Sequence, residues 1–505
     1  MTTLAIIVVY LGVVLAIGLF SHRFFRGTSE DFFVAARTLG PFILLVSLFG
    51  ANMTAFAVLG SAGEAYMEGI GVFALMASSS GLVIPVVFYF IGTRVWALGK
   101  RRGYLTPVQF FRERWDSDGL GLLLFVVQIA LLVPYLLIGV MGGGSTLTQV
   151  TDGLVPGWVG GLVICVVVLA YVTYGGMRGT VWVNVFQTVV LLALGFIAFW
   201  AIVSKLGGLD AAMQRVMASN PDLLVRGEHI KPWQLLTYTC IPLSAGVFPH
   251  MFIHWLTARN AASFKPVIAF YPVCIAIVWI PSVVLGVLAR ADFPDLGVAG
   301  ANSVLVQMIN LHAPGVLAGL LAAGVFSAIM NSFDSQVHAA GTMFTQDIVR
   351  HYGFHDRMSE KQQIMVGRIF MVAILVVTYL LSLVTTRSIF KLGVWCFTGF
   401  AALFPVVVAA VFWKRSTKWG ALASTLTVAV LWICFVIHGW KDAGYTIAGT
   451  GVMPVAVILL ASTAAMIGGS LLTRPPAAET LAKFFPDAST GRVEDEDRLY
   501  SRRRG

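Results

Sequence analysis

Long apolar runs alternate with short polar segments along most of the chain. Each run holds about 20 residues or more, the length that an α-helix needs to cross the hydrocarbon core of a bilayer. The pattern predicts an all-α, multi-pass membrane protein with about 13 membrane helices in one transmembrane domain, residues 1–473. We expect the helices near residues 3–21, 38–62, 70–93, 119–148, 155–175, 181–203, 233–257, 266–289, 314–346, 364–385, 389–413, 417–438 and 452–472.

Two of these runs, 38–62 and 233–257, are interrupted near their middle in similar ways. The interrupting residues are Ser47, Gly50, Asn52 and Thr54 in the first run and Pro242, Ser244, Gly246 and Pro249 in the second. A backbone polar group released inside lipid costs several kcal/mol unless protein or water satisfies it. Paired interruptions therefore predict a secondary transporter with a site at mid-membrane, built from two inverted five-helix repeats, about 38–203 and 233–413.

Composition and charge exclude a soluble protein and predict the topology. Hydrophobic residues make up 58% of the chain and charged residues 11%. The net charge of +10 does not indicate a nucleic-acid partner, because Lys and Arg cluster in short segments between apolar runs. Their distribution predicts an N-terminus outside and a C-terminus inside the cell membrane. The polar tail, 474–505, is expected to be disordered in the cytoplasm.

The most polar stretch inside any run is 324–342. Ala328, Asn331, Ser332, Ser335 and Thr342 recur there at helical spacing and share one face. Neutral oxygens on one face, together with carbonyls of an interrupted helix, suit a hard monovalent cation. The same stripe is also typical of a polar seam between packed membrane helices, and the spacing alone leaves both interpretations open.

Asp334 is the only carboxylate well inside a run, and it lies off this stripe. An intramembrane carboxylate is expensive, so a functional role is the default hypothesis. We expect Asp334 either to orient the residues that bind a coupling ion, without binding the ion itself, or to carry a proton.

Several motifs, in this order and spacing, resemble the sodium:solute symporter family, which transports proline, pantothenate, sugars, iodide and monocarboxylates. The matching stretches are 47–56 with Gly60 and 63–66, 174–187, 327–336 with 345–347, and, more weakly, 248–250 with 257–259. The resemblance implies a leucine-transporter-type fold of five plus five helices. It also implies a sodium site made by the carbonyls of Gly50, Met53 and Ala328 and the side chains of Asn331 and Ser332.

Two positions depart from the family pattern. A hydroxyl residue is usual at Asn331, and an aspartate is usual at Asn184, which makes Asn184 a candidate coupling residue. We expect sodium as the coupling ion. Proton coupling through Asp334 or a histidine, and an uncoupled or sensory membrane protein, are the alternatives.

The solute is expected beside the interrupted helices. The candidate binding residues are Asn52 and Thr54 on the first, Ser79 in the hydroxyl cluster 78–80, and Ser244 with the neighbouring 237–239 on the second. The runs hold no deep Lys or Arg, so a small neutral or zwitterionic solute or a monocarboxylate fits best, and a sugar also fits. The sequence lacks a nucleophile–base pair and a His-Glu metal motif, which argues against an enzyme. It leaves the oligomeric state open.

Overall fold

The computed structural model describes residues 2–24, 27–226, 230–313, 315–353, 358–385, 387–439 and 445–485. Ten helical segments there are long and apolar enough to cross a membrane, or up to twelve if each of two bent helix pairs is one span. The long segments are α1 (Thr2–Phe20), η4–α6 (Ala74–Arg102), α8 (Asp118–Val150), α9 (Gly157–Lys205), α13 (Phe264–Asp292), α16 (Val316–Met343), α17 (Glu360–Val384), α18 (Ile389–Ala402) with α19 (Phe404–Phe412), α20 (Lys418–Gly439) and α21 (Pro454–Leu471).

Two bent pairs lie where the sequence predicts interrupted helices. In the first, α3 (Pro41–Asn52) continues into Phe56–Glu68, which comprises η3 (Phe56–Gly60) and α4 (Ser61–Glu68), at an angle of 61°. In the second, Pro232–Gly246, which comprises α11 (Pro232–Tyr238) and η7 (Ile241–Gly246), meets α12 (Pro249–Leu256) at 48°. The prediction of two broken helices is thus met in the structure.

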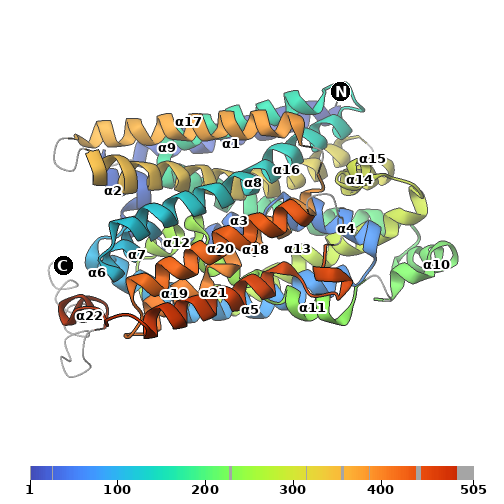
Figure 1. Cartoon of the computed structure of the whole chain (residues 1–505). Helices are drawn as coiled ribbons and strands as arrows, with labels where there is room; N and C mark the ends of the chain where they lie inside the picture. Colours follow the sequence, from blue (N-terminus) through green and yellow to red (C-terminus); the bar gives the residue numbers. More distant parts are fainter. Residues whose placement is uncertain are drawn as a thin grey trace.

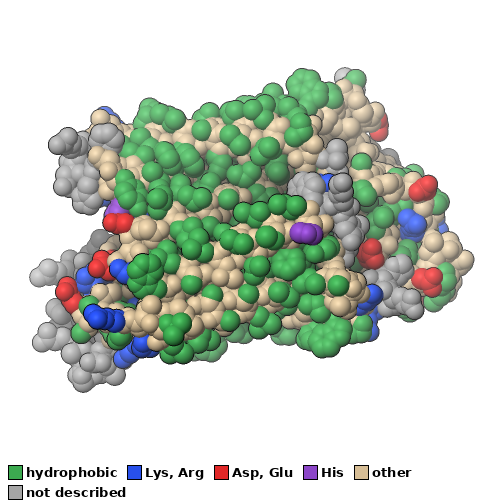
Figure 2. Space-filling model, in the orientation of Figure 1, with side chains coloured by type: hydrophobic (Ala, Val, Ile, Leu, Met, Phe, Trp, Pro, Cys, Tyr) green, Lys and Arg blue, Asp and Glu red, His purple; other side chains and the backbone are tan. Residues whose placement is uncertain are grey.

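The remaining helices are short and connect the long ones. They are α2 (Ser29–Val34), α7 (Pro107–Trp115), α10 (Leu209–Ser219), α14 (Val298–Ala301), α15 (Val304–His312), η9 (Phe344–Gly353) and α22 (Ala478–Phe484). The helices α5 (Ser79–Val87) and α6 (Thr93–Arg102) are parts of the long segment η4–α6. In Figure 1 the long helices run roughly side by side, with α10 at one end and α6, α7 and α22 at the other, which we call the basic end. Figure 2 shows apolar side chains over the visible flank and charged side chains towards the two ends. This distribution is that of a protein whose flank faces lipid.

The helix α9 is not one straight rod, because Gly176 interrupts it. Gly176 has φ 56° and ψ −151°, a backbone conformation that only glycine adopts readily. A β-carbon on Gly179 would lie 3.4 Å from the carbonyl oxygen of Tyr171, eight residues earlier. A continuous helix would separate these residues by about 12 Å. The chain therefore turns back at Gly176, and its two halves correspond to the predicted helices 155–175 and 181–203.

The two bent pairs are joined to each other at the basic end. The amide of Leu39, just before α3, donates to the carbonyl of Thr257 at 3.0 Å. The amide of Arg259, just after α12, donates to the carbonyl of Leu39 at 2.9 Å. The bridge between Leu39 and Ala258 is the one isolated β-bridge in the described part of the chain. It draws the ends of α3 and α12 together.

The tail differs from the expectation of disorder after residue 473. Residues 478–484 form the helix α22, and Phe484 is buried. The short helix is stabilised by docking on α7, because a helix of this length is not stable alone in water. The rest of the predicted tail, 486–505, lies outside the described residues.

Candidate functional site

The break after α3 interrupts the regular main-chain hydrogen bonding of a helix inside the bundle. Met53 leaves the helix with extended backbone (φ −85°, ψ 124°), and its amide bonds back to the carbonyls of Phe49 and Gly50. The Thr54 hydroxyl accepts a hydrogen bond from the Phe56 amide at 2.9 Å and so caps the second half of the span. The hydroxyl and the extended residue together explain why this apolar segment stops and restarts.

The break before α12 follows from Pro249 and from a carbonyl that accepts two hydrogen bonds. Pro249 is the first residue of α12, where its missing amide leaves no donor unsatisfied. The amides of Val247 and Phe248 both donate to the carbonyl of Ser244, at 2.9 and 3.0 Å. This arrangement ends the η7 segment and redirects the chain.

Gly50 lets three helices approach closely at the first break. A β-carbon at Gly50 would lie 2.1 Å from Thr188 Oγ1 on α9 and 2.5 Å from Asn331 Oδ1 on α16. Asn331 Nδ2 donates to Thr188 Oγ1 at 2.8 Å, and Thr188 Oγ1 donates to the carbonyl of Val46 at 3.1 Å. The structure therefore brings Gly50 and Asn331 together, as the cation-site prediction requires.

The other three predicted cation ligands lie on the same elements. Met53 is the residue that ends α3, and Ala328 and Ser332 are buried on α16, which packs directly against α3. Within the described residues, no group of three or more His, Cys, Asp or Glu side chains could hold a metal ion. Neutral carbonyl, amide and hydroxyl oxygens are the donors present here, and they suit sodium better than a transition metal.

Asp334 is joined to the polar stripe rather than separate from it. Its carboxylate accepts hydrogen bonds from Tyr171 Oη at 2.8 Å and Ser335 Oγ at 3.0 Å. The Asn184 amide satisfies its surroundings best with its nitrogen directed at Asp334 Oδ2 and at Asn331 Oδ1, each 2.9 Å away. Asn184 thus connects the buried carboxylate to a candidate cation ligand.

A small central cavity lies against both breaks, with about 40 Å³ of space open to water-sized molecules. Its lining residues are Asn52, Met53, Phe56, Ala57, Met76, Ser80, Ile84, Tyr135, Tyr238, Ile241, Pro242, Ser244, Ala245, Phe248, Trp279 and Phe397. None of these lining residues carries a formal charge. The cavity wall is thus mostly apolar and partly aromatic, with a few hydroxyl and amide groups.

Two of the four predicted solute residues, Asn52 and Ser244, line this cavity. Thr54 and Ser79 are not among its lining residues. Thr54 caps Phe56, and the Ser79 hydroxyl donates to the carbonyl of Leu75 at 2.8 Å. Ser80, from the same hydroxyl cluster, lines the cavity instead.

Three residues at these sites were not predicted from the sequence: Thr188, Tyr171 and Trp279. Thr188 follows Asn184 by four residues and so shares its helical face, a signal that was available in the sequence. Tyr171 reaches Asp334 only because α9 folds back at Gly176. The buried Trp279 Nε1 has no hydrogen-bond partner among the described residues, although the ring lines the cavity.

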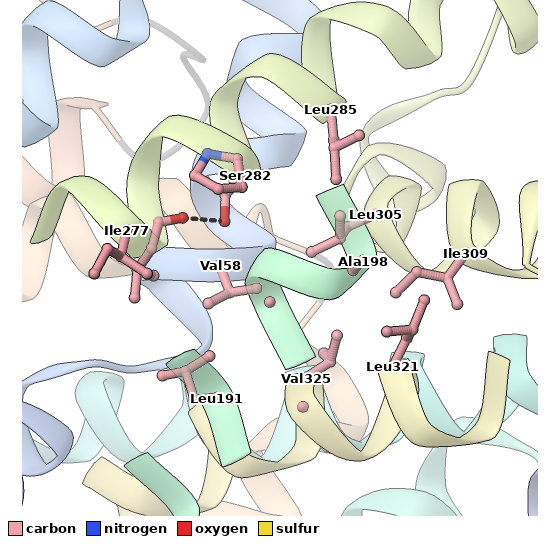
Figure 3. Close-up of a pocket in the computed structure, with 14 residues that line it drawn as sticks. Val58, Leu191, Ala198, Ile277, Ser282, Leu285, Leu305, Ile309, Leu321 and Val325 are labelled. Carbon is pink, nitrogen blue, oxygen red and sulfur yellow. Dashed lines mark hydrogen bonds between the residues drawn. The ribbon is translucent and has the colours of Figure 1, made fainter. Parts of the chain in front are cut away.

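A second cavity, shown in Figure 3, lies between α9, α13, α15 and α16 and is almost wholly apolar. Its one polar side chain is Ser282, whose hydroxyl already donates to the carbonyl of Val278 at 2.8 Å. This small space, about 30 Å³ open to water-sized molecules, offers no group to orient a polar solute. The central cavity is therefore the better candidate for the solute.

Comparison with known proteins gives a consistent result. Residues 32–427 match the sodium:solute symporter family. The osmoregulated proline transporter OpuE of Bacillus subtilis is 24% identical over 91% of this chain and 93% of its own length. The sodium/pantothenate symporter of Escherichia coli is 25% identical over 94% of this chain and 98% of its own length.

Solved structures show the same fold. A Na+-coupled sialic acid symporter in a substrate-bound, outward-open state has a TM-score of 0.77 at 15% identity, covering 94% of this chain and 99% of that one. Mhp1, a nucleobase-cation-symport-1 family transporter in a closed conformation, has a TM-score of 0.57 at 14% identity, covering 92% and 98%. The fold is thus that of the leucine-transporter type, and the resemblance found in the sequence motifs is confirmed. The chain belongs to the sodium:solute symporter family: it is a multi-pass membrane transporter that uses sodium, and it is not an enzyme.

Proposed function

We propose that this chain imports a small neutral, zwitterionic or monocarboxylate solute together with sodium by alternating access. One observation carries the proposal: the same break in the chain serves both sites. Asn52 and Met53 line the central cavity, while Gly50, two residues before Asn52, contacts Asn331. A cation that orders this turn therefore also orders the wall of the solute cavity, which is a direct route to coupling.

The sodium ligands in this proposal are the carbonyls of Gly50, Met53 and Ala328 and the side chains of Asn331 and Ser332. The Asn331 nitrogen is engaged by Thr188, and the amide oxygen, which accepts a hydrogen bond from Asn184, keeps a second lone pair to ligate the ion. An amide is longer than the hydroxyl expected here, and the close contact with Gly50 holds it in place.

Asp334 and Asn184 act in this proposal as supports for the cation site. Asp334 supplies a negative charge one residue from the ligand stripe, and Asn184 links that charge to Asn331. The chain thus keeps a carboxylate near the ion although position 184 holds an amide.

The solute class follows from the lining of the cavity. Asn52 and Ser244 are proposed to bind its polar group, while aromatic rings such as Phe56 and Phe248 contact its apolar body. The N-terminus of α12 follows Phe248 directly, and its partial positive charge favours a carboxylate. The curated relatives carry proline and pantothenate in their names, and both solutes combine a carboxylate with an apolar body. Thr54 and Ser79 act indirectly, by holding the backbone around the cavity.

The topology proposed is thirteen spans in one domain, 1–473, with the N-terminus outside and the C-terminus inside. Support comes from α9, whose 49 residues would extend about 73 Å as one rod, more than twice a bilayer core. Counting its halves separately adds one span to the twelve. The two five-helix repeats, 38–203 and 233–413, then each begin with a broken helix. The basic end is the cytoplasmic one, because it carries the Lys- and Arg-rich α6 and α7.

The test is uptake into proteoliposomes of purified protein, with proline, pantothenate and short monocarboxylates as labelled probes. We expect one of these probes to accumulate when a sodium gradient is imposed and to leak out when a sodium ionophore collapses it. Ser244→Ala should raise the KM for that probe, while the half-saturating sodium concentration changes less. If none of the probes is taken up at a rate that depends on the sodium gradient, the proposal is contradicted.

A further inference from the structure

The C-terminal helix occupies an aromatic groove at the basic end. The ring of Phe484, which is 6% exposed, stacks on Tyr104 with centroids 6.4 Å apart. It also meets the edge of Phe110 at 5.6 Å. Residues 478–485, which we call the C-terminal latch, are thus fixed by the one large apolar side chain that they bury.

Two cations hold the end of the latch. The guanidinium of Arg114 lies 5.8 Å from the Phe484 ring and 5.1 Å from the Phe485 ring. The ammonium of Lys414 lies 5.9 Å from Phe485. Burial lowers the pKa of Arg114 to about 10, so the group is still charged at neutral pH. Cation–π contacts of this kind are strongest where water is excluded.

Arg114 also fastens the groove to the bundle. Its Nε donates to the carbonyl of Ala410, and its Nη2 donates to the carbonyl of Trp413, each at 3.0 Å. Ala410 lies in the last turn of α19 and Trp413 follows that helix directly, so Arg114 adds a donor at the helix end, where Ser416 also donates to the Trp413 carbonyl. The latch therefore contacts a side chain that is anchored on a membrane helix.

The groove is in direct contact with the second broken helix. Phe110, which meets Phe484 on one side, meets Phe252 of α12 on the other, with centroids 5.6 Å apart. Arg37 donates from Nη2 to the carbonyl of Tyr104 at 2.7 Å and from Nη1 to the carbonyl of Leu256 at 3.4 Å. Tyr104 and Phe110 thus contact the latch and also contact the end of α12, Phe110 directly and Tyr104 through Arg37.

We propose that the C-terminal latch is an autoinhibitory contact that stabilises closure of the basic end. The inference rests on the proposed alternating access, in which α12 must move away from α6 and α7 to open the central cavity at this end. With Phe484 in place, Tyr104 and Phe110 are packed from both sides, and α12 leaves only by breaking the Phe110–Phe252 contact. With Phe484 removed, Phe110 gains space to move with α12, and the open state becomes more populated.

The experiment measures how often the cavity opens to the basic end, and it needs no solute. Ala245, which lines the cavity and is 1% exposed, is replaced by cysteine in a protein whose five native cysteines are substituted. A membrane-impermeant maleimide is then applied from the side of the basic end. Phe484→Ala, and separately a chain ending at Ala477, are compared with Glu479→Ala as the matched control. Glu479 lies on the same helix, its side chain is 87% exposed, and its ion-pair partner is Lys483 at 3.7 Å.

We expect Phe484→Ala and the shortened chain to raise the labelling rate about tenfold, the effect of one well-packed aromatic contact. Glu479→Ala should label at the parent rate. Phe484→Leu, which keeps apolar volume but loses the ring, should give an intermediate rate and guards against misfolding of the alanine variant. The latch proposal is refuted if all these variants are monodisperse, keep sodium-driven uptake and label at the parent rate. The proposed function is not affected by that result. Faster labelling of the Phe484 variants, in a protein that shows no sodium-driven uptake of any probe, would support the latch and contradict the proposed function.

Discussion

Replacing Gly50 by alanine tests the cation site where the packing is tightest. The added methyl would lie 2.1 Å from Thr188 Oγ1 and 2.5 Å from Asn331 Oδ1, so one of these groups must shift by about 1 Å to reach normal contact. Both side chains are buried and bonded to each other, so the shift breaks that hydrogen bond or misdirects the Asn331 oxygen. The loss should be about 1–3 kcal/mol, which corresponds to a rise of about 5- to 150-fold in the half-saturating sodium concentration.

Sodium affinity can be measured in two ways for this variant. Uptake at a series of sodium concentrations gives the half-saturating value, and the sodium-dependent rise in unfolding temperature gives binding without any solute. Gly60→Ala in the same broken helix is the control. Its β-carbon would meet nothing closer than Ile389 Cγ2 at 3.4 Å, an ordinary contact, and the residue is helical. If Gly50→Ala and Gly60→Ala show the same sodium dependence, the cation does not bind at this break.

Three further variants, one of them a double substitution, test the cation site, the role of Asp334 and the turn in α9. Replacing Asn331 and Ser332 together by alanine should abolish sodium stimulation of uptake; unchanged stimulation would remove both from the site. Asp334→Asn keeps the shape of the side chain but removes its charge, so the half-saturating sodium concentration should rise several-fold while a pH gradient alone still drives no accumulation. Loss of a proton-driven component in that variant would instead make Asp334 a proton carrier. Gly176→Ala should lower stability by about 1–3 kcal/mol, because φ is positive and the β-carbon would meet the Phe32 ring at 2.6 Å; an unchanged unfolding temperature would contradict the turn in α9.

The sequence predicts the broken helices well because particular residue types cause the interruption. Glycine, proline and polar residues in an apolar run leave main-chain groups that need new partners, and the structure shows such partners at Met53 and Val247. The polar stripe on α16 is equally predictable from the sequence, since helical spacing alone puts Asn331 and Ser335 on one face.

The partners of those residues were harder to predict. Ser79 looks like a ligand residue but satisfies its hydroxyl on the carbonyl four residues earlier, as serine commonly does inside helices. Spacing cannot distinguish that bond from one to a solute. The contact of Tyr171 with Asp334 depends on the fold of α9. The helix α22 is too short to be expected from propensity, and only its docking explains it.

The bridge between Leu39 and residues 257–259 has a consequence for how this protein evolves. Both of its hydrogen bonds join main-chain atoms, so no exchange of side chains removes them unless proline is introduced. The backbone thus joins α3 to α12 at the basic end, while in the proposed function the side chains of the cavity wall select the solute. A substitution at Ser244 or Trp279 can therefore change the proposed solute preference without removing the bridge between the two broken helices.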